Sequence, residues 1–483
     1  MKKMSKILGV VLSVAMVLPT FAAVGCGPAA DPTAKNYDLT IGYDAGGYGT
    51  QWLENVVTAF CEKEGIDRKR VLIEAEKGYT TTLSAKLEAN TNIRDVCITE
   101  EATQRQWAAM GYLEPLDEVF SMTLSTGETV ESVLADGYKD IGYLKNVYGE
   151  HYYLFPFTQG AGGMYYNKTL FTQKGWSVPT TYDELIALCK KIYAEEVADQ
   201  PDKNKQIYPM ICSADISAYW DFLVQNWMVQ LMGVDSFKEF CEFESAENFN
   251  PESVYGKAKK GALDAFWNLV VADETTGTER PWVINDSADY TAAQMLFVQG
   301  KAAMIPNGAW LESEVSASMP EGMEIALMPT PVINGAKTDA EGKPIQVNFN
   351  CSANSIFVPK NAAHKDTAKK FIAFMCEPDM VADFISEAGS PRPLKVDLSK
   401  VTGLTACQQS VIDIWSTAQN FTFMSKSVLT NTGRAGVWMK GYPYGAMMFK
   451  DSNGKRQTAA EYLNEEYSYC AAEWADWIAD ANL

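Results

Sequence analysis

Strand-like and helix-like segments alternate in the amino-terminal part of the chain, and this alternation restricts the fold more than any other feature. Apolar and polar residues alternate over 39–43, as in a strand, and the apolar residues of 52–60 then fall on one helical face. The order repeats with a strand-like run at 71–73, a helical segment at 80–89 and another strand-like run at 95–99. Such repetition predicts an α/β fold with parallel sheets.

Two loops that follow these strands are candidate binding positions. Open parallel sheets bind ligands beyond the carboxyl ends of their strands, so we expect Tyr48 and Glu100 to lie beside a cleft. Tyr48 lies in the glycine-rich turn 46–49, which lacks both G-x-G-x-x-G spacing and a following Gly-Lys-Ser/Thr. The turn therefore does not indicate a nucleotide site. The alternative role of both residues is loop capping or solvated surface.

The amino terminus has the pattern of an export signal. Three lysines among the first six residues precede an apolar run at 7–18 and small residues at 22–25. This is the composition of a cleaved secretory signal peptide. The run is shorter than the roughly 20 apolar residues that span a bilayer. We therefore predict a signal peptide at 1–25 and a soluble mature chain.

The signal ends at a cysteine. Residues 23–26, Ala-Val-Gly-Cys, resemble the lipobox of bacterial lipoproteins, although Leu is favoured where Ala23 stands. The resemblance implies lipid attachment, palmitate included, at Cys26 and a flexible linker over 26–36. The chain would then lie on the outer face of the membrane of a Gram-positive-type bacterium. The alternative is an ordinary cleavage site with a cysteine nearby by chance.

The predicted mature chain is strongly acidic. Removing residues 1–25 takes away three lysines and leaves 38 basic against 61 acidic residues, a net charge of −23. Such a surface repels phosphate backbones and anionic lipid head groups. We therefore expect no nucleic-acid partner, and we expect the lipid alone to make the membrane contact.

Cysteine and histidine positions argue against a disulfide framework and a metal site. Nine cysteines besides Cys26 are scattered without short repeated spacing. Four of them lie in apolar runs, where cysteine behaves as a small hydrophobe, namely Cys97, Cys189, Cys351 and Cys376. We expect mostly free buried thiols, with one or two disulfides left open. His151 and His364 are far apart and lack partners at zinc-ligand spacing, so we expect no metal and no cofactor.

An ordered set of motifs then runs along the chain. Residues 155–171 read FPFTQGAGGMYYNKTLF, 178–185 read VPTTYDEL, and 297–310 read FVQGKAAMIPNGAW. They are followed by a strand-and-helix segment at 354–375 and by Gly-Ser-Pro-Arg-Pro at 389–393. In this order the motifs resemble the first family of extracellular solute-binding proteins of ABC importers, relatives of maltose-binding protein.

The resemblance implies a two-lobed α/β fold of the periplasmic-binding-protein type, with a ligand cleft at a hinge. The implied first lobe comprises residues 37–155 and 352–390, and the second comprises 156–351 and 391–483. Hinge closure requires ligand contacts on both sides. The resemblance implies no catalytic residue.

Candidate ligand contacts combine aromatic planes with polar side chains, as the C–H faces and hydroxyl rim of a neutral sugar require. Trp310 matches the family position whose indole stacks on a sugar ring, and its alternative is a core aromatic. Trp220 also fits a helical core stripe. Arg392 suits either an anionic group or sugar hydroxyls. The full set of candidates is Tyr48, Glu100, Thr158, Gln159, Trp220, Trp310, Asn350, Arg392 and Trp438.

The family resemblance implies the substrate-binding lipoprotein of an ABC importer. We expect a monomer that captures a carbohydrate and delivers it to the permease transmembrane subunits. Twelve tryptophans favour an oligosaccharide. The alternatives are a binder of peptides, polyamines or glycerophosphodiesters, a structural adhesin, and a secreted glycan-active enzyme that uses Glu100 or Glu101.

Overall fold

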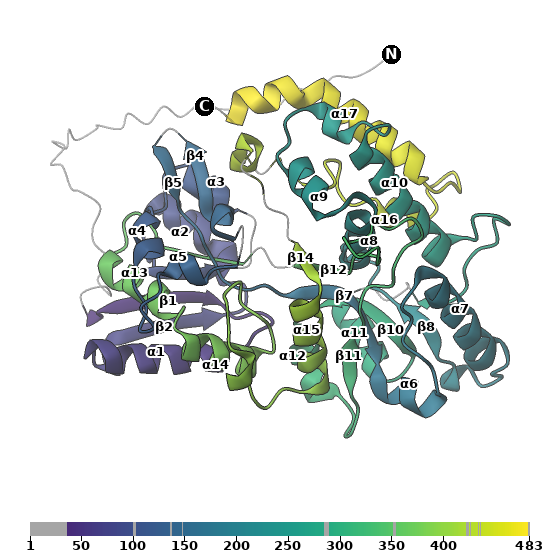
Figure 1. Ribbon diagram of the computed structural model, residues 1–483, viewed down its shortest axis with the longest axis horizontal. Coiled ribbons are helices and arrows are strands. Elements are labelled where there is room, and N and C mark those ends of the chain that lie inside the picture. The colour runs from purple at the N-terminus through teal and green to yellow at the C-terminus, as the bar shows by residue number, and fades with distance from the viewer. Residues whose placement is uncertain are drawn as a thin grey trace, which may run out of the picture.

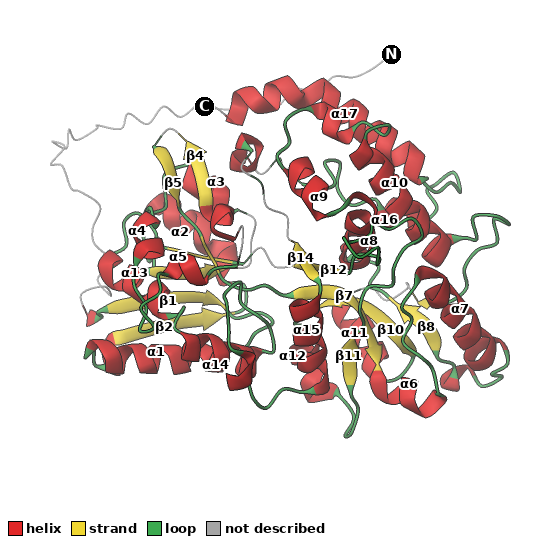
Figure 2. Cartoon of the chain, viewed as in Figure 1, coloured by secondary structure: helices red, strands yellow, loops and turns green. Residues whose placement is uncertain are grey.

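Two lobes meet at the centre of the molecule in the computed structural model (Figures 1 and 2). Each lobe has its own β-sheet with helices around it, which confirms the predicted two-lobed α/β fold. The signal segment, Cys26 and Glu100 lie outside the described residues. The structure describes residues 36–99, 103–135, 138–146, 148–284, 289–350, 354–421, 425, 427–432, 434 and 436–481.

The first lobe contains a five-stranded sheet in the order β2-β1-β3-β13-β6. Its strands are β1 (Leu39–Asp44), β2 (Val71–Glu76), β3 (Val96–Thr99), β6 (Phe155–Pro156) and β13 (Ser355–Phe357). β1 pairs in parallel with β2 and β3, as predicted, whereas β13 runs antiparallel to β3 and β6. The carboxyl ends of β1 and β2 point toward the second lobe in Figure 1.

Helices cover this sheet on both faces. They are α1 (Gln51–Glu64), α2 (Leu83–Ala89), α3 (Gln104–Ala109), α4 (Asp117–Ser121), α5 (Val130–Val133), α13 (Lys365–Phe374) and α14 (Pro378–Ala388). A hairpin of β4 (Tyr143–Asn146) and β5 (Gly149–Tyr152) extends from the lobe. The predicted apolar face of α1, from Trp52 to Phe60, is buried in the core. The helix ends at Gly65, where a φ of 69° favours glycine.

The second lobe contains a seven-stranded sheet. Its main path is β14-β12-β7-β10-β8-β9, with β11 paired to β7. The strands are β7 (Ala161–Asn167), β8 (Tyr208–Ile211), β9 (Val283–Ile284), β10 (Ala302–Gly308), β11 (Ile325–Leu327), β12 (Val347–Asn350) and β14 (Gln419–Phe421). β10 runs parallel to β8 and antiparallel to β7.

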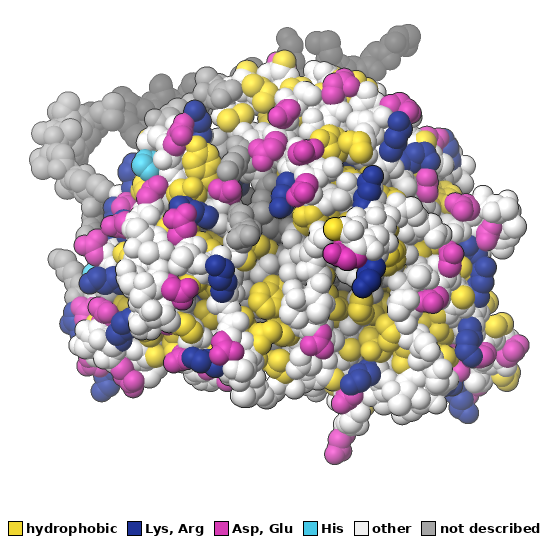
Figure 3. All heavy atoms as spheres, in the orientation of Figure 1, with side chains coloured by type: hydrophobic (Ala, Val, Ile, Leu, Met, Phe, Trp, Pro, Cys, Tyr) yellow, Lys and Arg dark blue, Asp and Glu magenta, His cyan; other side chains and the backbone are white. Residues whose placement is uncertain are grey.

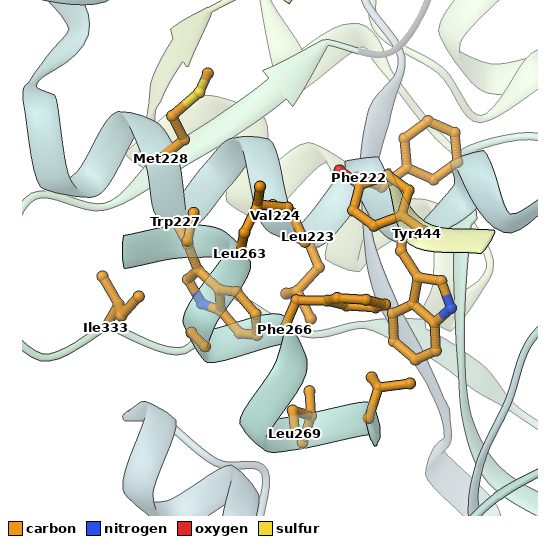
Figure 4. Close-up of a cluster of buried hydrophobic side chains, with 14 of the residues drawn as sticks. Phe222, Leu223, Val224, Trp227, Met228, Leu263, Phe266, Leu269, Ile333 and Tyr444 are labelled. Atoms are coloured by element: carbon orange, nitrogen blue, oxygen red, sulfur yellow. The ribbon is translucent and has the colours of Figure 1, made fainter. Parts of the chain in front are cut away.

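The second-lobe helices include one that is buried on nearly every side. They are α6 (Lys168–Lys174), α7 (Tyr182–Tyr193), α8 (Asp221–Met232), α9 (Val234–Cys241), α10 (Val254–Phe266), α11 (Tyr290–Val298), α12 (Leu311–Val315), α15 (Ala406–Thr417), α16 (Tyr444–Met448) and α17 (Ala459–Ala481). All residues of α8 except Leu231 are buried. Leu223 and Trp227 of α8 meet Leu263 and Phe266 of α10 (Figure 4). Helix α17 lies over α10 at the edge of the lobe in Figure 1.

Three passages of the chain between the lobes can be placed from the described residues. Two crossings lie between β6 and β7 and between β12 and β13. Beyond the second crossing, the chain continues in the first lobe past residue 390. Leu394 is buried in the first-lobe core, and Lys395 N donates to Val133 O at 2.7 Å. Residues up to Leu404 pack on the same core, whereas Cys407 belongs to a second-lobe cluster. The Pro-containing motif at 389–393 therefore follows α14 within the first lobe, and the third crossing lies near residue 405.

The cysteines of the described part of the chain are buried and free, which confirms the expectation for these positions. They are Cys61, Cys97, Cys189, Cys212, Cys241, Cys376, Cys407 and Cys470. Among the described residues, no helix combines the length and apolar character needed to span a membrane. In the same residues, no group of three His, Cys, Asp or Glu side chains is placed to hold a metal ion.

Candidate functional site

A pocket of about 430 Å3 lies where the two lobes face each other. We name it the Trp310 pocket. The first lobe contributes the loop after β1 and the turn after β2, and the second contributes residues at the starts of α11 and α12. Its charged and aromatic lining residues are Asp44, Tyr48, Lys77, Tyr219, Tyr290, Trp310 and Glu314. Lining from both lobes is what a cleft needs if closure is to depend on its ligand.

Trp310 lies two residues after the end of β10 and precedes the first residue of α12. Its half-buried indole lies 5.7 Å from the Phe222 ring and 6.4 Å from the Tyr219 ring, measured between centroids. Gly308 is required beneath it, because an added Cβ there would lie 2.4 Å from the indole. The strand end therefore presents the tryptophan to the pocket.

The lobes touch at two points beside this pocket. A Cβ added to Gly47 would lie 2.2 Å from the Trp310 Cβ, so the glycine-rich turn approaches Trp310 more closely than any other residue type allows. Lys77 Nζ donates a hydrogen bond of 3.2 Å to the Tyr290 hydroxyl, and this bond raises the pKa of Lys77. The described conformation is therefore one in which the lobes already meet.

Asp44, at the end of β1, is occupied by its own lobe. Its carboxylate accepts hydrogen bonds from Gly78 N at 2.9 Å, Thr80 N at 3.1 Å and Thr80 Oγ1 at 2.6 Å. These bonds hold the turn that carries Lys77 against the loop that carries Tyr48. Asp44 therefore shapes the pocket more than it offers a free carboxylate to a ligand.

Tyr48 forms an inner wall of the Trp310 pocket and is 5% exposed. Its ring lies 6.4 Å from the Phe157 ring and 6.1 Å from the Phe384 ring. The strand-end rule therefore placed Tyr48 at the cleft, where it packs on the first-lobe core.

A second pocket of about 500 Å3 adjoins the first and shares Tyr219 with it. We name it the Trp438 pocket. Its walls come from the start of α8, from Phe349 of β12 and from the loop at 436–442. The lining residues are Ile216, Ala218, Tyr219, Asp221, Phe222, Gln225, Phe349, Gly436, Val437, Trp438 and Tyr442. The two pockets therefore share one aromatic wall residue, and each has further aromatic side chains in its lining.

Asp221 holds Trp438 in the wall of this pocket. Its carboxylate accepts a 2.7 Å hydrogen bond from Trp438 Nε1 and further bonds from Tyr444 and Gln225. Burial raises the pKa of Asp221 to about 6, although these hydrogen bonds act in the opposite direction. Asp221, at the start of α8, thus positions an aromatic side chain.

Three predicted site residues lie at the lobe crossings. Thr158 and Gln159 are buried just after β6, and Gln159 N donates to Pro391 O at 2.8 Å. Asn350 ends β12 and pairs through its backbone with Ala161. Thr158 and Gln159 are close to the hinge, and they do not line either of the two pockets.

The structure places two predicted ligand contacts elsewhere. Trp220 has no exposed surface, and its ring centroid lies 5.5 Å from that of Phe266. It is therefore a core residue, which was the alternative interpretation of its sequence pattern. Arg392 is also buried, and its guanidinium donates to Phe157 O at 3.1 Å and to Met375 O. Arg392 therefore ties the first crossing to α13 and is not presented to a ligand.

Sequence reasoning missed several lining residues. Lys77 directly follows β2, so the strand-end rule that selected Tyr48 would also have found it. Tyr219 adjoins Trp220, but only the fold shows which of the two faces the cleft. Tyr290 and Tyr442 have no local signal in the sequence.

The surface around the lobes carries mixed charge. On the face in Figure 3, acidic and basic side chains are interspersed over both lobes. Ion pairs such as Lys440–Glu465, at 2.8 Å, bring opposite charges together. This face therefore presents no continuous basic stripe of the kind that binds nucleic acid.

Comparison with known families gives a match over most of the chain. The model of a family described as bacterial extracellular solute-binding protein matches residues 46–382. This range includes the loop after β1, the three sequence motifs up to Trp310 and the return into the first lobe.

Individual relatives match at low identity. A diacetylchitobiose binding protein, NgcE, from Streptomyces coelicolor is 22% identical over 285 residues, which is 59% of this chain and 54% of the relative. A multiple sugar-binding protein from Streptococcus mutans is 26% identical over 262 residues, 53% of this chain and 56% of the relative. The chain thus spans about half the length of the curated relatives it matches.

Solved structures share the architecture. The solute-binding protein RafE in complex with raffinose has a TM-score of 0.57 and 16% identity, with 92% of this chain and 99% of that chain covered. At this identity, the similarity shows the fold.

Proposed function

Because the chain belongs to the bacterial extracellular solute-binding protein family, we propose that it captures a carbohydrate between its lobes and delivers it to an ABC permease. The observation that carries the proposal is the pair of aromatic-lined pockets joined at Tyr219. The relatives named for diacetylchitobiose and for multiple sugars, and the raffinose complex, support the same ligand class.

The side chains of the pockets suit a neutral sugar. Trp310 and Tyr219 supply ring surfaces for apolar C–H faces, and Lys77 supplies a polar group for hydroxyls, while Trp438 and Gln225 line the second pocket with little exposed surface. Trp310 and Tyr48 come from opposite lobes, so a sugar in the Trp310 pocket would contact both. Ligand-dependent closure follows from that arrangement.

The ligand is proposed to be an oligosaccharide. The two pockets, about 430 and 500 Å3, each fall within the range of small-ligand sites. Since Tyr219 lines both, a chain of sugar rings can pass from one pocket to the other along its ring. A single ring would leave one aromatic wall unused.

Other ligand classes fit the charged groups less well. A polyamine site needs converging free carboxylates, but Asp44 already accepts three hydrogen bonds and Lys77 lies in the same pocket. A phosphodiester site needs a cluster of cations, but the guanidinium of Arg392 is engaged by backbone carbonyls. The family is one of solute-binding proteins, and we assign no catalytic residue.

A ligand screen tests this function. The mature chain should melt at a higher temperature with raffinose, maltotriose or diacetylchitobiose, and not with peptides or polyamines. A ligand present at one hundred times its dissociation constant adds about 2.7 kcal/mol of stability to the folded state. A shift with peptides or polyamines and none with any glycan would disprove the carbohydrate assignment.

We also propose that two acyl chains on Cys26 tether the protein, because two chains anchor firmly where one is marginal. Cys26→Ser should release the protein into the medium with its ligand affinity unchanged, because the linker proposed over 26–36 would separate Cys26 from the first strand, β1, which begins at Leu39. Cell fractionation and calorimetry on the released protein check this. Retention of the Cys26→Ser protein on the membrane, or loss of ligand affinity on release, would contradict the separation of tether from receptor.

A further inference from the structure

The loop that forms one wall of the Trp438 pocket lacks regular secondary structure. Residues 436–443, all of which the structure describes, form neither helix nor strand. Ladder hydrogen bonds therefore do not hold Trp438 in place. Its position depends on side chains that reach the loop from other elements.

Two fully buried charges supply those contacts. Lys259 of α10 and Glu466 of α17 form an ion pair, and neither side chain has exposed surface. Lys259 Nζ donates to Val437 O at 2.8 Å, and Glu466 accepts from Met439 N at 2.7 Å. The pair thus binds the backbone on both sides of Trp438.

Further contacts converge on the same loop. Lys259 Nζ lies 4.7 Å from the centroid of the Trp438 ring. The Tyr462 hydroxyl donates to Gly441 O at 2.7 Å and lies 3.3 Å from a carboxylate oxygen of Glu466. Asp221 accepts a hydrogen bond of 2.7 Å from the indole nitrogen. The indole and its flanking backbone are therefore fixed together.

A buried ion pair is a weak source of stability. Its desolvation penalty offsets much of the attraction, and apolar replacements of similar volume are often neutral or stabilising. Its hydrogen bonds, in contrast, define one geometry for the groups around it. At this site, those groups are the backbone of a pocket wall.

We propose that Lys259 and Glu466 are positioning residues that preorganise the Trp438 wall for the part of the ligand that extends beyond the Trp310 pocket. The part of this inference that concerns ligand binding rests on the proposed function. Through this pair, α17 sets the affinity for the longer ligand without touching it.

The test compares two double variants, each of which removes an ion pair that involves α10. Lys259→Met with Glu466→Gln removes the buried pair and keeps side-chain volume. The matched control is Lys260→Met with Asp264→Asn, which removes an exposed pair of α10 with an Nζ to Oδ2 distance of 2.6 Å. Both proteins are studied as full mature chains, well below their melting temperatures.

The first readout needs no ligand. Hydrogen exchange of the Trp438 indole proton, assigned by its loss in Trp438→Phe, should become at least tenfold faster in the Lys259/Glu466 variant and stay unchanged in the control. Equal exchange in wild type and variant would overturn the positioning role. This result is independent of whether any glycan binds.

The second readout is the dependence of affinity on ligand length. Binding of the oligosaccharide found by the screen should weaken at least tenfold in the Lys259/Glu466 variant, while binding of its monosaccharide changes less than twofold. Equal loss for both ligands, or no loss, would overturn the inference. If wild type bound no glycan, the proposed function would fail, and indole exchange would still decide the positioning role. If the double variant did not fold, Tyr462→Phe would decide by the same two readouts.

Discussion

Replacement of Trp310 by alanine should weaken oligosaccharide binding by at least about thirtyfold. Truncation of a buried tryptophan anchor at a binding surface costs about 2 kcal/mol or more, and each 1.4 kcal/mol is a factor of ten. Trp310 is expected to meet this condition because a bound sugar would cover the part of its indole that Phe222 and Tyr219 leave open. Isothermal titration calorimetry with the wild-type ligand measures the loss.

The matched control is Trp474→Ala. Trp474 lies on α17, where it packs on Phe249 and Trp477 and lines neither of the two pockets. This variant should lose some stability and keep its ligand affinity. If both variants bound as wild type does, Trp310 would be removed from the proposed site.

Replacement of Arg392 by methionine should lower the free energy of unfolding by about 3 kcal/mol and leave ligand affinity within about threefold of wild type. The change leaves the carbonyls of Phe157 and Met375 buried without their donor. Each buried acceptor without a partner costs about 1–3 kcal/mol. Urea denaturation and calorimetry on the folded variant separate the two effects.

Arg280→Met is the control for this change. The Arg280 guanidinium likewise donates to a backbone carbonyl, Asn268 O, at 2.7 Å and lies 4.7 Å from the Trp282 ring, away from the lobe crossings. Both variants should be destabilised with binding intact. Loss of binding in Arg392→Met alone would restore Arg392 as a ligand contact and refute the structural assignment.

Local patterns in the sequence were sufficient for much of the first lobe. The alternation at 39–43 and the helical face at 52–60 predicted β1 and α1, because each depends on side-chain period alone. The strand-end rule brought Tyr48 to the cleft. The motif that ends at Trp310 supported the family resemblance, and in the structure it forms β10 with the tryptophan two residues after the strand ends.

Adjacent residues show where local pattern fails. Tyr219 and Trp220 are both aromatic, yet Tyr219 lines both pockets and Trp220 is fully buried. A 3-10 turn at Ser217–Trp220 precedes α8, and its tighter winding changes the direction of each side chain relative to an α-helix. The period of the helix therefore does not predict which of the two faces the cleft.

The sequence by itself determined the order of the first strands and helices, the family and the aromatic candidates, because periodicity and motifs are properties of neighbouring residues. Only the tertiary structure decided which polar groups serve the fold and which face the cleft. Lys259 and Glu466 are 207 positions apart, and Arg392 is 235 positions from Phe157. Whether a charge at such a position meets a partner or a pocket depends on burial and hydrogen-bond geometry, which arise when distant segments pack together.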